Sequence, residues 1–386
     1  MGFFMTNTLS PPSSAPTDSP ALLARLRQLP LYRAALAGVP DSADWAEVPF
    51  LTRDRLTEAF QAGELAHPDA VRVHLTPHPG GHWLPEYATR ADIEAHGRAG
   101  AAAFALAGIR PQDHAQIAFG YHRFAGGWIM QDGLEALGAK TIPFGPGESE
   151  AQLQTMRLLN VRVLVSAPSF AQKLGEAGAR PELLISSGEP LTSIAGRREK
   201  VEAALGCTAL DCFASSEAGL MALETPAKNG LRVLSDWVYL EVIDPETGAV
   251  LPDGERGELV VTHLTREAMP LLRFRTGDLT RIEHRPDGVF LPGGVFGNVG
   301  GMLKVKGVKL FPREVAFWLA GHGLDHTQHT LRIWSQNGAD RVGIHVRGTG
   351  DLAALKTDFQ KRFAMKLDEL HLDDHHEGKG VLDERG

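Results

Sequence analysis

Between residues 93 and 214 the sequence repeats one pattern, in which a helical stretch is followed by a short apolar strand. Such an alternation is typical of a parallel sheet with helices on both faces. Ligands of open α/β sheets bind at the carboxyl ends of the strands. The expected strands cover residues 114–119, 140–144, 161–167, 182–188 and 208–214. We therefore expect a site in the loops that follow Phe119, Val165, Ser186 and Phe213.

The pattern changes after residue 232. Residues 237–264 read as two strands joined by a Gly- and Pro-containing turn, which predicts an antiparallel hairpin. A glycine-rich stretch over residues 291–302 then precedes a further strand and helix. We predict an α/β protein with mostly parallel sheets and flanking helices in its large domain, and a small α+β domain after it. The expected boundaries are 21–297 for the large domain, about 232–296 for its β-rich subdomain, and 298–386 for the small domain.

The first 20 residues are rich in Ser and Pro, so residues 1–20 are predicted to form a flexible tail. The start lacks the basic and apolar regions of a secretory signal, and no run of about 20 apolar residues occurs. These features predict a cytoplasmic protein that does not bind membranes.

The net charge of -8 argues against a nucleic-acid partner. The two cysteines, Cys207 and Cys212, are too few for a disulfide framework and indicate a reducing compartment. On a strand, their spacing of five would turn the thiols to opposite faces, which disfavours a zinc site. The sequence does not determine the oligomeric state, and a homodimer is one possibility.

Four motifs carry a resemblance to a known family. They are SSGEP at 186–190, DCFASSEAG at 211–219, a long segment ending in RFRTGDL at 246–279, and VKGVKLFPREV at 305–315. In order and approximate spacing they resemble the phenylacetate–coenzyme A ligase branch of the adenylate-forming superfamily, from about Val48 to Arg385. The resemblance implies the fold of that superfamily, with a mobile small domain. It also implies ATP or AMP, Mg²⁺ and coenzyme A as cofactors.

The implied reaction has two steps. A small carboxylate, expected to be aromatic or otherwise apolar, attacks the α-phosphate of ATP to give an acyl adenylate and pyrophosphate. A thiol, expected to be that of coenzyme A, then displaces AMP. Charge that develops on the phosphate calls for a metal ion, a lysine and hydrogen-bond donors.

The segment FASSEAG implies three roles. Phe213 would stack on adenine, Ser216 would contact the α-phosphate, and Glu217 would hold Mg²⁺. The alternative is an ordinary turn in which Ser215 or Ser216 caps free backbone N–H groups.

Asp278, in RTGDL, is implied to bind the two ribose hydroxyls, since a carboxylate offers two acceptor oxygens. A turn that happens to contain Asp is the alternative. The remaining implied nucleotide-binding positions are Gly188, Glu189, Pro190, Asp211, Ala214, Ser215 and Asn298.

The segment FGYHRFAGGW resembles the family's acyl pocket. Its candidates are Tyr121, His122, Phe124 and Gly127. Ordinary packing of aromatic side chains under a helix is the alternative.

The phosphate loop departs from the family pattern. The family has a Ser/Thr/Gly-rich run ending in Gly-Lys, whereas the matching positions here are Thr76, Gly80, Gly81 and His82. Prolines 77 and 79 lack the backbone N–H that a phosphate cradle uses. A neutral histidine also binds phosphate less strongly than a lysine.

Two further regions can be compared with the family: the hinge, about which the small domain of the family rotates, and the C-terminal end. Asn298 stands where the family has an arginine, and Gly300 or Gly301 where it has an aspartate. Lys379 matches the lysine that bridges the carboxylate and the α-phosphate, with a solvated lysine as the alternative. The nearby HLDDHHE run raises a metal site as an alternative to a solvated surface.

Three hypotheses follow. The first is an acid–thiol ligase that makes an acyl adenylate and then an acyl-coenzyme A thioester. The second is a noncatalytic nucleotide or acyl-adenylate binding protein on the same fold. The third is an altered ligase that uses a preformed adenylate.

Overall fold

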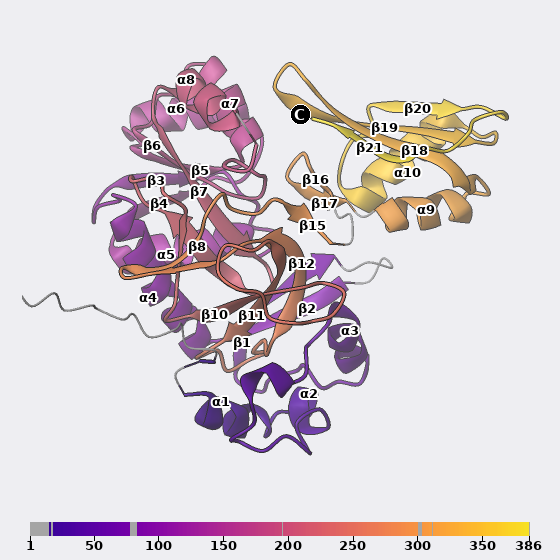
Figure 1. Cartoon of the computed structure of the whole chain (residues 1–386). Coiled ribbons are helices and arrows are strands. Elements are labelled where there is room, and N and C mark those ends of the chain that lie inside the picture. The colour runs from indigo at the N-terminus through magenta and orange to yellow at the C-terminus, as the bar shows by residue number, and fades with distance from the viewer. Residues whose placement is uncertain are drawn as a thin grey trace, which may run out of the picture.

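The computed structural model describes residues 15–16, 18–77, 83–194, 196–299, 303–310 and 312–385 of the 386-residue chain (Figure 1). The strands of its largest sheet are β3 (His114–Ile117), β4 (Lys140–Pro143), β5 (Val163–Ser166), β6 (Leu183–Ser186), β7 (Thr208–Ser215), β8 (Gly219–Glu224), β9 (Leu231–Val233), β13 (Glu283–Arg285) and β14 (Gly288–Leu291). Their order in the sheet is β13-β14-β9-β8-β7-β6-β5-β3-β4. The half from β4 to β7 is parallel, as predicted, and the half from β7 to β13 is antiparallel.

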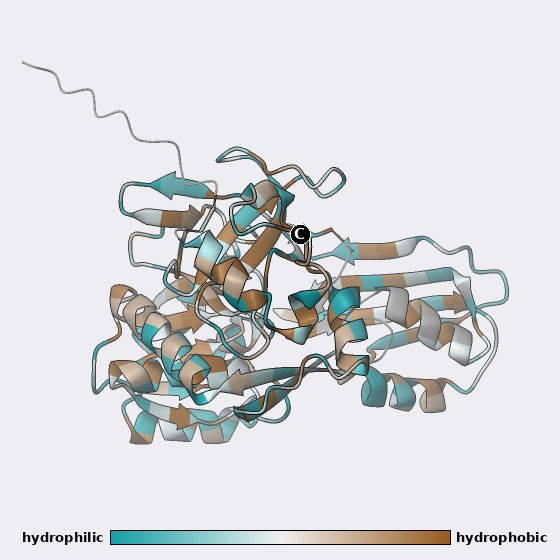
Figure 2. Ribbon diagram, turned by 90° about the horizontal axis from the view of Figure 1, so that it is seen from below, coloured by the Kyte–Doolittle hydropathy of each residue, from teal (hydrophilic) through white to brown (hydrophobic). Residues whose placement is uncertain are grey.

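Helices cover both faces of the parallel half. They are α4 (Arg90–Leu106), α5 (Gly126–Leu137), α6 (Ser149–Leu158), α7 (Pro168–Glu176) and α8 (Arg197–Leu205). Val163 and Val165 of β5 belong to the core shared with α4 and α5, whereas Leu164 belongs to the core under α6, α7 and α8. This alternation follows from the two-residue period of a strand. Hydrophobic and hydrophilic residues alternate along the helices in Figure 2, as expected where one face of a helix is buried.

Two of these helices show how the local sequence sets their start. Helix α4 begins with a reciprocal capping box between Thr89 and Asp92. Helix α8 begins at Arg197. The amide of Thr192 is bonded to the Asp211 carboxylate, and the residue before the helix, Gly196, has φ +74°.

A second sheet and a hairpin lie beside the large sheet. Strands β10 (Val238–Ile243), β11 (Gly257–His263), β12 (Phe274–Thr280) and β15 (Gly297–Asn298) form an antiparallel sheet, and β1 (Ala70–Pro77) pairs with β2 (Trp83–Thr89). The pairing of β10 with β11 confirms the predicted hairpin. The N-terminal helices are α1 (Ser19–Leu26), α2 (Pro30–Arg33), the 3-10 turn η1 (Trp45–Glu47) and α3 (Arg53–Gln61).

The C-terminal elements, orange to yellow in Figure 1, form a unit with its own hydrophobic cluster, which runs from Val305 to Leu370. They are β16 (Leu303–Val305), β17 (Val308–Leu310), α9 (Pro312–Gly321), β18 (Asp325–Gln336), β19 (Ala339–Arg347), α10 (Leu352–Phe363), β20 (Glu369–Leu372) and β21 (Gly380–Glu384). The sheet order is β20-β19-β18-β21. Within the described ranges, no helix has the length and apolar character needed to cross a membrane.

Candidate active site

A cleft of about 500 Å³ lies at the carboxyl ends of β6 and β7, and we name it the Asp278 cleft. It brings together eight of the residues that the resemblance marks as nucleotide-binding, although they come from four separate segments. These are Gly188, Glu189, Pro190, Asp211, Phe213, Ala214, Asp278 and Asn298. Further residues of its wall were not among the predicted ligands; they are Ser187, Ser193, Ile194, Leu231, Val295 and Phe296. The loop after Ser186 was expected to contribute, and Ser187 directly follows that residue.

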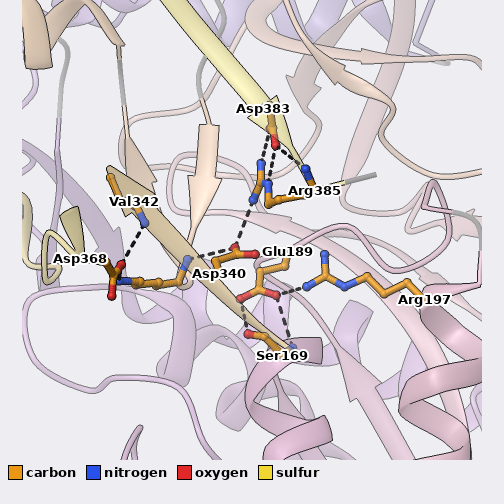
Figure 3. Close-up of polar contacts among 9 residues, drawn as sticks. Ser169, Glu189, Arg197, Asp340, Val342, Asp368, Asp383 and Arg385 are labelled. Atoms are coloured by element: carbon orange, nitrogen blue, oxygen red, sulfur yellow. Dashed lines mark hydrogen bonds and ion pairs between the residues drawn. The ribbon is translucent and has the colours of Figure 1, made fainter. Parts of the chain in front are cut away.

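The loop after β6 is fixed by the side chain of Glu189, which is only 1% exposed. Its carboxylate pairs with Arg197 at the start of α8 and accepts a hydrogen bond from the Ser169 hydroxyl at 2.6 Å (Figure 3). Gly188 has φ +83°, a conformation that glycine adopts without strain. Glu189 therefore holds the backbone of the loop in place along the cleft wall.

Asp211 links this loop to β7. Its Oδ2 accepts from the Thr192 amide, and its Oδ1 accepts from the Cys212 amide, each at 3.0 Å. Burial is the main cause that raises the pKa of the Asp211 carboxyl. Phe213, two residues along β7, is 6% exposed and forms part of the wall.

Asp278 and Asn298 face each other on β12 and β15. Asn298 donates from Nδ2 to Oδ1 of Asp278 over 3.4 Å, and the Asp278 amide donates to Thr276 Oγ1 at 3.0 Å. The Asp278 residue is 7% exposed and lines the cleft. The pairing of β12 with β15 and these two hydrogen bonds thus fix Asp278 in the wall of the Asp278 cleft.

The C-terminal segment also reaches this cleft. Asp383 and Arg385 line it, and Arg385 pairs with Asp383 at 2.6 Å and with Asp340 at 3.1 Å (Figure 3). No sequence motif indicates these two residues, because only the pairing of β21 with β18 brings the end of the chain to this place.

A second cleft of about 370 Å³ adjoins the first, and we name it the Phe124 cleft. Ser187, Gly188 and Ala214 line both clefts. Much of its wall is apolar, and residues of the C-terminal unit close one side. The apolar wall includes Trp83, Phe119, Phe124, Ile129 and Met130, and the C-terminal unit contributes Gly307, Val308, Lys361, Arg362, Phe363 and Ala364.

Of the four predicted acyl-pocket residues, Phe124 lines this cleft, while Tyr121, His122 and Gly127 do not. The Tyr121 ring packs edge-on against Trp128 at 5.4 Å, and burial raises the pKa of its phenol. A Cβ on Gly127 would lie 3.0 Å from two ring carbons of Tyr121. His122 is exposed. These three residues therefore do not line the Phe124 cleft, and the contact between Tyr121 and Gly127 of α5 fits the packing alternative.

The residues at and after the end of β7 lie in two different surroundings. Ser215 and Ser216 line the Phe124 cleft, and Ser215 Oγ accepts from the Ala218 amide at 3.1 Å, as the turn alternative expected. Glu217 lines neither cleft. Its side chain is 1% exposed and lies 3.2 Å from Arg53 Nη2, and the Arg266 guanidinium bonds its backbone oxygen.

This placement does not fit a magnesium site at Glu217. A buried carboxylate beside arginine presents no open oxygen face to a hydrated cation, which keeps several waters. Among the residues that the structure describes, no group of three or more His, Cys, Asp or Glu side chains is arranged to hold a metal, so the HLDDHHE alternative also lacks support.

Lys379 lies away from both clefts. It is on the open face of the C-terminal sheet, where its amide donates to Thr330 Oγ1 at 3.0 Å. Thr76, the first residue of the expected phosphate loop, is buried in the wall of the Phe124 cleft. The other expected loop and hinge positions, Gly80, Gly81, His82, Gly300 and Gly301, lie outside the described residues.

Comparisons with known proteins identify the family of the chain. No family model matches the chain. A phenylacetate–coenzyme A ligase of Pseudomonas putida is 32% identical over 345 residues, which cover 82% of this chain and 77% of that protein. The enzyme of the same name from Aromatoleum evansii is 34% identical over 340 residues, with the same coverage of 82% and 77%. The chain belongs to the phenylacetate–coenzyme A ligase family. Its expected superfamily and fold class are thereby confirmed.

Solved structures of one ligase in two states can also be compared with this chain. A 2-hydroxyisobutyryl-CoA ligase, in complex with 2-HIB-AMP and CoA in its thioesterification state, matches with a TM-score of 0.85 and 26% identity, over 98% of this chain and 94% of that one. The same ligase in its postadenylation state, with equal identity and coverage, matches with a TM-score of 0.68. Both comparisons pair this chain with the same ligase. The difference between the two TM-scores therefore reflects a difference in conformation between the two states of that ligase. This member of the phenylacetate–coenzyme A ligase family is therefore more similar to the thioesterification complex of that ligase than to its postadenylation complex.

Proposed function

We propose that the chain activates a carboxylic acid with ATP and transfers the acyl group to coenzyme A. The observation that carries this proposal is the adjacency of the Asp278 cleft and the Phe124 cleft, which share Ser187, Gly188 and Ala214. One cleft suits AMP and the other an acyl group, so the shared wall is where the mixed anhydride would lie. The structural neighbour that holds 2-HIB-AMP and CoA supports the same reading.

In the first step a carboxylate oxygen attacks the α-phosphorus, the bond to the β-phosphate oxygen breaks, and pyrophosphate leaves. In the second step the sulfur attacks the acyl carbon, AMP leaves, and the thiol loses its proton. The role of the described residues is to position the two reactants, which removes much of the entropic cost of bringing them together.

Within the Asp278 cleft, we propose that Asp278 accepts hydrogen bonds from both ribose hydroxyls and that Phe213 lies against adenine. Both side chains line the cleft. Glu189 and Asp211 are proposed to position the loop rather than to contact the nucleotide, because their carboxylates are occupied by Arg197 and by the Thr192 amide. Ser216, in the wall of the second cleft, is the proposed hydroxyl for the α-phosphate.

The walls of the Phe124 cleft indicate the substrate class. Phe119, Phe124 and Met130 would bury an apolar group, and an aromatic ring would pack on them with little loss of conformational entropy. We therefore propose an aryl or otherwise apolar acid. Gly307 and Val308, on the side contributed by the C-terminal unit, mark where the thiol chain of coenzyme A would enter.

We propose that residues 21–297 and 298–386 are the two domains, and that the small one changes its position between the steps. Lys379 is distant from the Asp278 cleft in the present arrangement, so it bridges the α-phosphate only after such a change. The different TM-scores of this chain against two states of one structural neighbour, 0.85 and 0.68, support this proposal. Mg²⁺ is proposed to arrive bound to the phosphates of ATP, and Glu217 is not assigned to it.

A noncatalytic nucleotide-binding protein is the second candidate, because the phosphate loop carries Pro77, Pro79 and His82 in place of the family's residues. Incubating the purified chain with ATP, CoA, Mg²⁺ and a panel of aryl and alkyl acids distinguishes the two. A ligase yields acyl-CoA and AMP in equal amounts. AMP binding without any thioester would favour the second candidate.

A further inference from the structure

The C-terminal sheet has two unlike faces. Leu331, Ile333, Val342, Ile344 and Leu370 alternate along the strands and belong to the core, which includes Leu355 and Phe359 of α10. The intervening residues must point to the other face, since strand side chains alternate. That open face carries Lys379 and three histidines, and it forms a shallow depression of about 410 Å³.

The histidines converge because of strand register. His371, His345, Thr330 and Gly380 are partners across β20, β19, β18 and β21. His376 stacks on His345 with ring centroids 3.8 Å apart, and its Nε2 lies 3.0 Å from Thr330 Oγ1. The same Thr330 oxygen accepts from the Lys379 amide. We name His345, His371, His376 and Lys379 the histidine face.

The charge of this face depends on pH. Arg332 pairs with Glu384, while Glu369 and Asp373 lie 3.9 Å and 3.8 Å from His371 and His345. Arg347 is a further cation near His376. With neutral histidines these three acids balance the three cations Arg332, Arg347 and Lys379, whereas protonated histidines would make the face positive.

In this chain the segment that matches the family's phosphate loop has fewer hydrogen-bond donors for the β- and γ-phosphates of ATP. Two prolines remove backbone N–H groups, and histidine stands for lysine at position 82. If Lys379 is brought to the α-phosphate, the β- and γ-phosphates, which follow it directly, come against the groups beside Lys379. Those groups are the histidines.

We propose that the histidine face binds the β- and γ-phosphates of ATP, and the pyrophosphate that leaves, in place of the altered phosphate loop. This inference rests on the proposed function, because it requires that the small domain presents Lys379 to ATP. Burial, together with the neighbouring His345, keeps the pKa of His376 below its ordinary value. A bound polyphosphate opposes that effect, so the protein takes up protons as pyrophosphate binds.

The test is calorimetric titration of the full chain with pyrophosphate at pH 6 and pH 8, in two buffers of different ionisation enthalpy. The variant carries His345→Gln, His371→Gln and His376→Gln, and the control is His375→Gln, whose exposed side chain adjoins the face without lining it. His371→Gln alone is a milder variant, because the His371 side chain is 63% exposed. A second assay follows thioester formation from a synthetic acyl adenylate and CoA.

We expect wild-type and control proteins to bind pyrophosphate at least about tenfold more tightly at pH 6 than at pH 8, with proton uptake. The triple variant loses this dependence, His371→Gln loses part of it, and thioester formation stays within about twofold. Equal pyrophosphate affinity of the triple variant and wild type would overturn the proposal. Loss of only the thioester step would also overturn it, because the phosphates of CoA would then be the ligand. Intact pH-dependent binding without adenylation of any acid would refute the proposed function and leave the pyrophosphate site standing.

Discussion

The Asn298 side chain donates a hydrogen bond to the Asp278 carboxylate over 3.4 Å, across the pair formed by β12 and β15. Asn298 is the last residue of that sheet, and the C-terminal unit begins a few residues later. The proposed ribose ligand is therefore in contact with the residue about which the small domain is proposed to turn. A movement at this point changes the surroundings of Asp278 directly.

Replacing Asp278 with alanine removes the acceptor proposed for both ribose hydroxyls. Two hydrogen bonds to a charged group are together worth about 3 kcal/mol, so AMP affinity should fall about 100-fold. Calorimetry with AMP measures this, and Asp287→Ala, in an exposed turn, is the matched control. Unchanged affinity in Asp278→Ala would refute the ribose assignment.

Phe124 and Tyr121 should behave differently. Phe124→Ala removes part of the wall of the second cleft, and loss of buried ring contact worth about 2 kcal/mol should raise the KM for an aryl acid about 30-fold. Tyr121→Phe should leave that KM unchanged, because Tyr121 packs beside Trp128 outside the cleft. A large rise in KM for Tyr121→Phe would restore the original prediction that this tyrosine lines the pocket.

Glu217→Gln should lower stability rather than magnesium affinity. The change leaves Arg53 without its charged partner, and breaking a largely buried pair costs about 2 to 4 kcal/mol. Urea unfolding measures this loss, with the exposed Glu255→Gln as control. The Mg²⁺ concentration for half-maximal activity should stay the same, and a tenfold increase would instead assign Glu217 to the metal.

Two buried histidines make stability depend on pH. Burial, and next the charge of Arg266, lower the pKa of His96 to about 4 and that of His263 well below its ordinary value. In the unfolded chain these histidines have a pKa of about 6.5, so below that pH the unfolded chain binds protons that the folded chain does not bind. The contribution of the two neutral histidines to the free energy of unfolding is therefore fully present above about pH 6.5 and is lost as the pH falls.

Each histidine should contribute about 2 kcal/mol of loss between pH 6.5 and pH 5. The free energy of unfolding, measured by urea at several pH values, should fall less steeply in His96→Gln than in wild type. His375→Gln, which is exposed, should keep the full slope. Equal slopes for His96→Gln and wild type would contradict the burial of a neutral His96.

The sequence predicted the parallel half of the sheet because its strands are short apolar runs with a clear helical period between them. It did not predict that the sheet continues as an antiparallel half, since β8 and β9 carry no signal that distinguishes them from other short strands. It also did not predict that the Thr192 amide is bonded to Asp211, because the two residues are 19 positions apart in the chain.

The same limit applies to the site. The family motifs contain many of the residues that line the Asp278 cleft, and the binding roles of those residues stay predictions. They did not reveal Arg385, which reaches the cleft through the pairing of β21, nor the partner of Glu217, which comes from α3. They also placed Tyr121 and Gly127 at the substrate, although those two residues pack on each other.

The most direct test of ligase activity is ATP–pyrophosphate exchange by the purified chain with Mg²⁺ and a panel of aryl and alkyl acids. This reaction requires that an acyl adenylate forms and reverts. We predict exchange that depends on an apolar acid and is abolished by Lys379→Ala. Absence of exchange with every acid, in protein that still binds AMP, would contradict the account and indicate a nucleotide-binding protein.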